Sequence, residues 1–216
     1  PRILILIEFS EESGSPDLPH YMNLCKSKIG TPDLVICLDS GTGDYKRLWT
    51  TTSLRGLIGL QLRVDVLKEG VHSGGASGYV PSSFRIARQL LSRIENQETG
   101  EILLDELKVK IPDFRKKEIR KYVQVIGKEL RKEFPWVSNM QPSTNSNVEG
   151  VLRRTWRPAL SVVGGGGLPP SENAGNVLRP YTELKLSIRI PPFVNQKKAQ
   201  SAIKNVLLTN PPYSSK

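Results

Sequence analysis

The stretch Leu184-Lys185-Leu186-Ser187-Ile188-Arg189-Ile190 alternates apolar with polar side chains. Successive side chains of a β-strand point to opposite faces, so a period of two predicts a half-buried strand. Leu60 to Val66 shows the same alternation, with Gln61, Arg63 and Asp65 at the polar positions. Two such strands favour a sheet with one covered face and one open face.

The segments around these two strands have helical periodicity. Pro81-Ser82-Ser83 opens one helix, residues 111–134 carry a second, and residues 195–208 carry a third. Ala159 to Val163 reads as a short strand after the second helix. The order strand, helix, helical insert, strand, strand, helix predicts a ferredoxin-like domain of the α/β (α+β) class over residues 46–216. A complete ferredoxin-like layer has one more strand, which we expect to be missing here.

Residues 1–45 differ from the rest in pattern and charge. Ile3–Ile7 and Leu34–Leu38 are continuous apolar runs, which predict two buried parallel strands. Residues 1–45 carry three basic and seven acidic side chains, a net charge of −4, so a total of +10 leaves +14 for residues 46–216. We therefore expect two units, 1–45 and 46–216. Since two parallel strands cannot cover their own faces, we expect the first unit to be part of a larger sheet.

Composition excludes several classes of protein. With 38% hydrophobic residues the chain of 216 residues can build a core, and no apolar run approaches the ~20 residues of a membrane span. Two cysteines make neither a disulfide scaffold nor a four-cysteine zinc site, and they favour a reducing compartment, the cytoplasm. The basic charge would suit nucleic acid, but no Lys/Arg block with interleaved aromatic residues accompanies it. We expect neither a nucleic-acid nor a membrane partner.

Three carboxylates follow the two apolar runs of residues 1–45. Glu11 and Glu12 come just after the first run, and Asp39 ends the second. Ligands of open α/β sheets bind at the carboxyl ends of the strands, where these carboxylates could hold a cation and activate a water. The alternatives are a solvated Glu-Glu pair and a turn capped by Asp39.

Polar residues of the second unit suggest a site for an organic anion or a carbonyl group. His72 lies in the glycine-rich stretch of residues 70–81, where an imidazole could stabilise an oxyanion. Asn176 and Arg189 suit a carboxylate, because Arg offers a bidentate fork. A polar turn at His72 and a solvated Arg189 are the alternatives.

The order of these motifs is more specific than each motif alone. Glu-Glu-x-Gly-Ser at residue 11 is followed by Leu-Asp-Ser-Gly at 38, Val-His-Ser-Gly-Gly at 71, Trp-Arg-Pro-Ala-Leu-Ser at 156, and Asn-Val at 176 with Leu-Ser-Ile-Arg-Ile-Pro-Pro at 186. The series resembles the dinuclear zinc metallopeptidases of the carnosinase, aminoacylase and carboxypeptidase G family. It is most similar to the carnosinase-like dipeptidase branch, over about residues 3–192.

The resemblance implies a role for each matched residue. Glu11 would be the general base, Glu12 and Asp39 would each bind one of two zinc ions (manganese or cobalt being alternatives), and His72 would reach the partner subunit's site and polarise the scissile carbonyl. Asn176 and Arg189 would bind the substrate's terminal carboxylate. The resemblance further implies a ferredoxin-like lid, a homodimer formed through it, and a dipeptide or N-acyl amino acid as substrate.

Two of the family's motifs are not in this sequence. In the family a His-x-Asp motif precedes the Glu-Glu pair and a metal-binding histidine follows the lid, whereas His20 and His72 are the only histidines here. We expect an incomplete metal site and a fragment that is inactive by itself. The leading interpretation is the lid of a metal-dependent peptidase or amidohydrolase with part of its catalytic domain. The alternative is a non-catalytic dimerisation or interaction module derived from that lid.

Overall fold

The computed structural model describes residues 2–39 and 41–216. The chain divides into two compact units, Pro1–Thr42 and Gly43–Lys216. The three predicted metal or base residues are in the first unit, and His72, Asn176 and Arg189 are in the second.

The first unit contains only short helical segments over its described residues: η1 (Glu11–Ser13), α1 (Leu18–Leu24) and α2 (Lys26–Ile29). The two predicted buried strands are wrong: residues 2–39 form no strand, and the apolar runs are exposed, Ile3 at 81% and Leu38 at 95%. The apolar runs do not form buried strands because no other described element of this unit packs over them. A parallel pair buries both faces only beneath helices and beside further strands, and the two short helices of this unit do not supply that cover.

The second unit is built on an antiparallel sheet of three strands. β1 (Gly56–Asp65) and β3 (Ala159–Gly166) both pair with the central β5 (Tyr181–Ile190), giving the order β1-β5-β3. The alternation of β5 appears directly in its burial, since every second residue from Thr182 to Ile190 is buried. A register shift between Val162 and Gly164 interrupts β3, where the glycine run begins.

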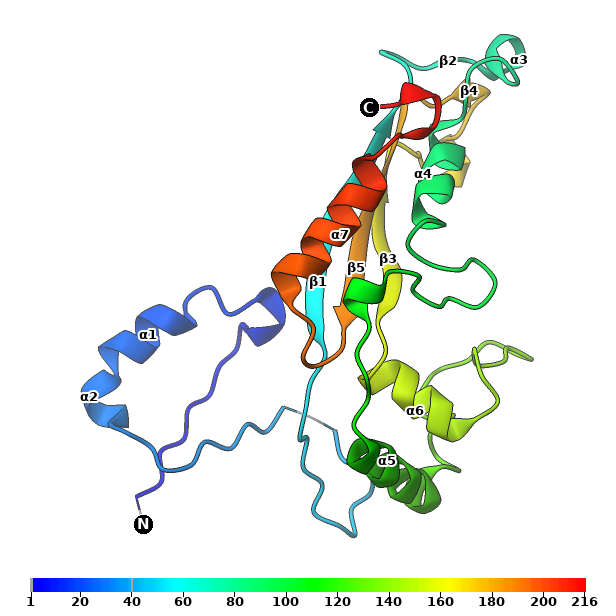
Figure 1. Cartoon of the computed structure of the whole chain (residues 1–216). Helices are drawn as coiled ribbons and strands as arrows, with labels where there is room; N and C mark the ends of the chain where they lie inside the picture. Colours follow the sequence, from blue (N-terminus) through cyan, green and yellow to red (C-terminus); the bar gives the residue numbers. More distant parts are fainter. Residues whose placement is uncertain (1, 40) are drawn as a thin grey trace. The chain divides into compact units, whose positions relative to one another are not determined.

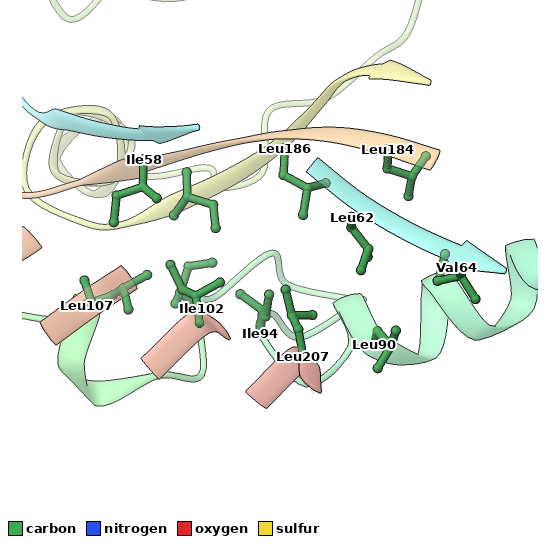
Figure 2. Packing of buried hydrophobic residues seen from close by; sticks show 14 of the residues in the cluster. Ile58, Leu62, Val64, Leu90, Ile94, Ile102, Leu107, Leu184, Leu186 and Leu207 are labelled. Atoms are coloured by element: carbon green, nitrogen blue, oxygen red, sulfur yellow. The ribbon is translucent and has the colours of Figure 1, made fainter. Parts of the chain in front are cut away.

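Helices α4 (Ser83–Leu91) and α7 (Gln196–Leu208) cover one face of this sheet, and Figure 1 shows α7 running along it. Both begin with a side-chain cap, from Ser82 and Asn195 respectively. The core lies between the sheet and these helices, as Figure 2 shows for Ile58, Leu186 and Leu207 among others. The observed order strand, helix, strand, strand, helix confirms the predicted ferredoxin-like fold class.

A helical insert separates α4 from β3. It contains η2 (Asp105–Leu107), α5 (Asp113–Ile126) and α6 (Asn147–Thr155). The insert has a hydrophobic cluster of its own, made of Ile111, Ile119, Ile126, Leu130, Val151, Leu152 and Trp156. The predicted helix over residues 111–134 is too long, because α5 ends at Ile126 and the chain continues in turns.

Short elements gather at the end of the sheet where β5 begins. They are β2 (Val71–His72), α3 (Ser73–Ala76), η3 (Ser171–Asn173), β4 (Val177–Leu178) and η4 (Pro212–Ser214). β2 pairs with β4 in a separate two-stranded sheet. Two backbone hydrogen bonds join Lys216 to Asp65 at the end of β1. The Asp65 N–H donates to the Lys216 carbonyl at 2.7 Å, and the Lys216 N–H donates to the Asp65 carbonyl at 3.4 Å. Figure 1 shows β2, α3 and β4 at one end of the sheet and α5 and α6 at the other.

Candidate functional site

His72 and Asn176 are brought together by the small sheet of β2 and β4. His72 pairs with Val177, the neighbour of Asn176, and the backbone N–H of Ser73 donates to the Asn176 carbonyl at 2.9 Å. Both residues are exposed. The histidine and the amide predicted from separate motifs therefore lie side by side at one end of the second unit.

A backbone contact fixes the imidazole of His72. The N–H of Gly74 donates to His72 Nδ1 at 3.1 Å, so Nδ1 is the acceptor and the neutral ring carries its proton on Nε2. A β-carbon at position 74 would lie 2.9 Å from Cε1 and 3.0 Å from Nδ1 of His72. Only glycine leaves room for this ring position. The exposed Nε2–H is thus a donor available to an oxygen outside this chain's own fold.

Arg189 lies at the opposite end of the sheet. It is exposed on the face of β5 that α4 and α7 do not cover, between Leu57 on β1 and Ala159 on β3. Arg189 is eight steps along β5 from Tyr181, where the strand begins, and a strand rises by roughly 3.3 Å per step, or about 26 Å in all. Within one chain, Asn176 and Arg189 therefore do not contact the same carboxylate.

Glu11 and Glu12 lie in η1, Asp39 lies in an irregular segment, and all three side chains are exposed. Over residues 2–39 and 41–216, no three His, Cys, Asp or Glu side chains gather in a way that could hold a metal ion. The zinc pair that the sequence resemblance implies is thus not assembled by the residues described here.

Sequence reasoning missed an arginine at the start of β1. Arg55 Nη1 donates to the backbone carbonyls of Arg153 at 3.2 Å and Arg157 at 3.3 Å, at the carboxyl end of α6. Burial, followed by the positive charges of Arg189 and Arg154, lowers the pKa of Arg55. The only signal in the sequence is an arginine directly before the alternating strand, which is too common a pattern to single out.

The comparisons with known proteins agree with this fold. Residues 52–213 match the model of the peptidase dimerisation domain of M20 peptidases. The chain belongs to this family. The matched range contains the whole three-stranded sheet, the helical insert, and the residues His72, Asn176 and Arg189.

A curated relative of this M20 domain is a cysteinylglycine-S-conjugate dipeptidase of Corynebacterium striatum. The two are 25% identical over 214 residues, which cover 98% of this chain and 45% of the relative. This chain thus spans less than half the length of the relative that it matches. None of the helices within residues 2–39 and 41–216 is long and apolar enough to cross a membrane.

Three solved structures share the fold at 20% identity each. An M20 family metallo-carboxypeptidase from Sulfolobus solfataricus superposes with a TM-score of 0.69, over 93% of this chain and 45% of that one. Human carnosine dipeptidase 1 gives 0.64 over 91% and 41%. A di-peptidase from Saccharomyces cerevisiae gives 0.61 over 92% and 42%.

Proposed function

We propose that this chain is the lid and dimerisation part of an M20 peptidase or amidohydrolase that cleaves an amide bond next to a free carboxylate. The substrate class is a dipeptide or an N-acyl amino acid. One observation carries the proposal: Arg189 lies at one end of the three-stranded sheet, and His72 lies with Asn176 beyond its other end. Two ends that carry complementary halves of one site suit a dimer in which each copy completes the other.

The separation of the two ends decides how the halves combine. A dipeptide is much shorter than the length of β5, about 26 Å between Tyr181 and Arg189. A substrate that contacts both His72 and Arg189 must therefore take them from two different copies. In a two-fold dimer the same arrangement repeats, so each of two sites receives one half from each copy.

Each half has a chemistry of its own in this proposal. The Nε2–H of His72 donates to the scissile carbonyl oxygen and stabilises the negative charge that develops there. Asn176 lies beside it in the same copy, and its predicted role is to bind the terminal carboxylate of the substrate. Arg189 of the other copy binds the terminal carboxylate through its guanidinium fork.

Glu11, Glu12 and Asp39 enter this proposal from their motifs alone. Their predicted roles are general base for Glu11 and metal ligand for Glu12 and Asp39. The described residues do not form a three-ligand group, so a metal held by Glu12 or Asp39 would need further ligands from outside them. The cytoplasmic location and the homodimer are likewise predictions.

Subunit mixing in the full-length protein tests the composite site. His72→Ala and Arg189→Ala are each expected to abolish turnover. When the two variants are mixed and re-equilibrated, a heterodimer contains one site with both native residues and one with neither. With random exchange, half of the dimers are heterodimers, so activity should return to about one quarter of the wild-type value.

A mixture of His72→Ala with Asn176→Ala is the matched control. These two residues come from the same copy, so every site of their heterodimer lacks one of them and activity should stay lost. Recovery in the control but not in the first mixture would overturn the composite site. No turnover by the wild-type dimer with zinc, manganese or cobalt would instead support the alternative, a non-catalytic dimerisation module.

A further inference from the structure

Three arginines, Arg55, Arg157 and Arg189, lie at the end of the sheet where β1 and β3 begin and β5 ends. Arg189 on β5 pairs with Leu57 on one side and with Ala159 on the other. Arg55 precedes Leu57 by two residues, and Arg157 precedes Ala159 by two. Arg55 directly precedes β1, Arg157 lies in the segment between α6 and β3, and Arg55 Nη1 donates to the Arg157 carbonyl at 3.3 Å. All three arginines therefore lie at the end of the sheet where Leu57 and Ala159 pair with Arg189.

Of the three arginines, only Arg157 has an acidic partner among the described residues, and the neighbouring Arg153 and Arg154 are also paired with acids. Arg157 forms a two-pronged contact with Glu149, at 2.7 Å and 3.1 Å, and Arg154 pairs with Glu133. Arg153 also contacts Glu149, at 3.4 Å. Across the part of the chain that the structure describes, no ion pair to an acid is formed by Arg55 or Arg189. Two guanidinium charges therefore remain uncompensated next to each other.

Arg55 is held in place by main-chain oxygens at the end of α6. Its Nη1 serves both carbonyls, of Arg153 and Arg157, which leaves Nε and Nη2 as unused donors of a group that has five N–H bonds. The carboxyl end of a helix carries partial negative charge, so it stabilises Arg55 in this half-buried place without cancelling a full charge.

Burial and the charge of Arg189 lower the pKa of Arg55, which means that this charged arrangement costs free energy when nothing negative is bound. An anion placed between the two guanidinium groups would relieve that cost. Two carboxylates allow each guanidinium group to form the bidentate pair that arginine prefers. A single carboxylate would leave one of the two positive charges without a negative partner.

We propose that Arg55 and Arg189 together form a subsite for a dicarboxylic residue, aspartate or glutamate, at the carboxyl end of the substrate. The proposal rests on the peptidase function above and names its substrate class. Arg189 binds the α-carboxylate and Arg55 binds the side-chain carboxylate. Arg55 is thus a specificity-determining residue rather than part of the hydrolytic chemistry.

Binding of free amino acids tests the subsite without turnover. The probes are L-aspartate and L-asparagine, which differ by one charge at nearly equal size, titrated calorimetrically into the full-length protein. We expect the wild-type protein to bind L-aspartate at least about 10-fold more tightly than L-asparagine, the size of effect that charge-assisted pairing gives. Arg55→Gln should reduce this ratio to below about 2-fold and leave L-asparagine affinity unchanged.

Two further variants separate charge from fold. Arg63→Gln removes an arginine from the same face of β1, at the other end of the sheet, where Asp65 and Glu183 already pair with it. It should keep the wild-type ratio. Arg55→Lys keeps the charge but loses the bidentate guanidinium group, so it should give an intermediate ratio of L-aspartate to L-asparagine affinity. This variant also tests the subsite if Arg55→Gln does not fold.

Equal affinity of the wild-type protein for the two probes would overturn the subsite. So would an Arg55→Gln variant that binds both probes equally more weakly, because that result marks a structural role. The hydrolysis of Ala-Asp against Ala-Asn then reports on the peptidase function separately. If the binding preference exists but neither peptide is cleaved, the subsite stands and the proposed function fails.

Discussion

The backbone N–H of Gly74 donates to Nδ1 of His72 at 3.1 Å, across a gap too narrow for a β-carbon. This contact fixes the tautomer of the neutral imidazole and aims its second nitrogen outward. The glycine-rich stretch around His72 is therefore a positioning device for that ring. It also supplies a sharp test, because the neighbouring Gly75 has open space where a β-carbon would go.

Under the proposed peptidase function, we expect Gly74→Ala to lower kcat/KM of the full-length protein by about 100-fold, since a displacement of about 1 Å at a group that acts on the substrate has that effect. The added methyl group would displace the ring and break the hydrogen bond. Gly75→Ala, in the same short helix, should leave kcat/KM within about 2-fold of wild type. Equal losses in both variants would contradict the positioning role. Steady-state kinetics and a melting curve for each variant make the comparison.

The buried hydroxyls of Ser83 and Thr182 lie 2.8 Å apart and connect α4 to β5. Thr182→Val would leave the Ser83 hydroxyl buried without its partner, at a cost of about 1–3 kcal/mol in the free energy of unfolding. The double variant Ser83→Ala/Thr182→Val should recover part of that loss, because no polar group is then left unpaired. Urea unfolding of the wild type, the two single variants and the double variant measures these changes in the free energy of unfolding. Strictly additive losses would show that the two hydroxyls do not depend on each other.

Burial raises the pKa of Glu95, which follows α4 and forms a backbone bridge with Ile102. An acid whose pKa is higher in the folded state binds its proton more tightly there, so it favours the folded state below its unfolded pKa. This contribution is lost as the pH rises through the folded pKa. Glu95→Gln should therefore raise Tm slightly at pH 7.5 and change it little at pH 4.

The exposed Glu98 gives the control for this pH dependence. Glu98→Gln should show a smaller difference between the two pH values, since its side chain is solvated. Thermal melts at pH 4 and pH 7.5 suffice. A Glu95→Gln variant with a lower Tm than wild type at pH 7.5 would mean that an ionised Glu95 stabilises the fold.

The basic surface of α5 is the feature most easily mistaken for a nucleic-acid site. Lys117, Arg120 and Lys121 are exposed, and so is Lys128 in the turn that follows the helix. We expect only non-specific binding of duplex DNA, with Kd weaker than about 10 µM at 150 mM salt and a steep dependence on salt. Fluorescence anisotropy with two unrelated duplexes checks this. Submicromolar binding that differs between the duplexes, and that Lys117→Glu/Lys121→Glu abolishes, would reverse the prediction.

The sequence by itself determined the sheet of the second unit and the helices α4 and α7, because their signals are local. A period of two in residues 184–190 and a helical period after Ser82 and Asn195 need no distant partner to be recognised. The motif at His72 was recognisable for the same reason, and its glycines correspond to a real steric demand. The order of these elements was enough to predict the ferredoxin-like arrangement, which the strand order β1-β5-β3 bears out.

Only the tertiary structure decided how the candidate residues are grouped. Apolar runs such as Ile3–Ile7 predict buried strands only if other elements cover them, and the described first unit does not provide that cover. The pairing of β2 with β4 places Asn176 beside His72, and the length of β5 takes Arg189 away from both. The approach of Arg55 to Arg189 depends on register between strands that are more than a hundred residues apart in sequence. Contacts of that kind arise from packing over long range, which no local pattern encodes.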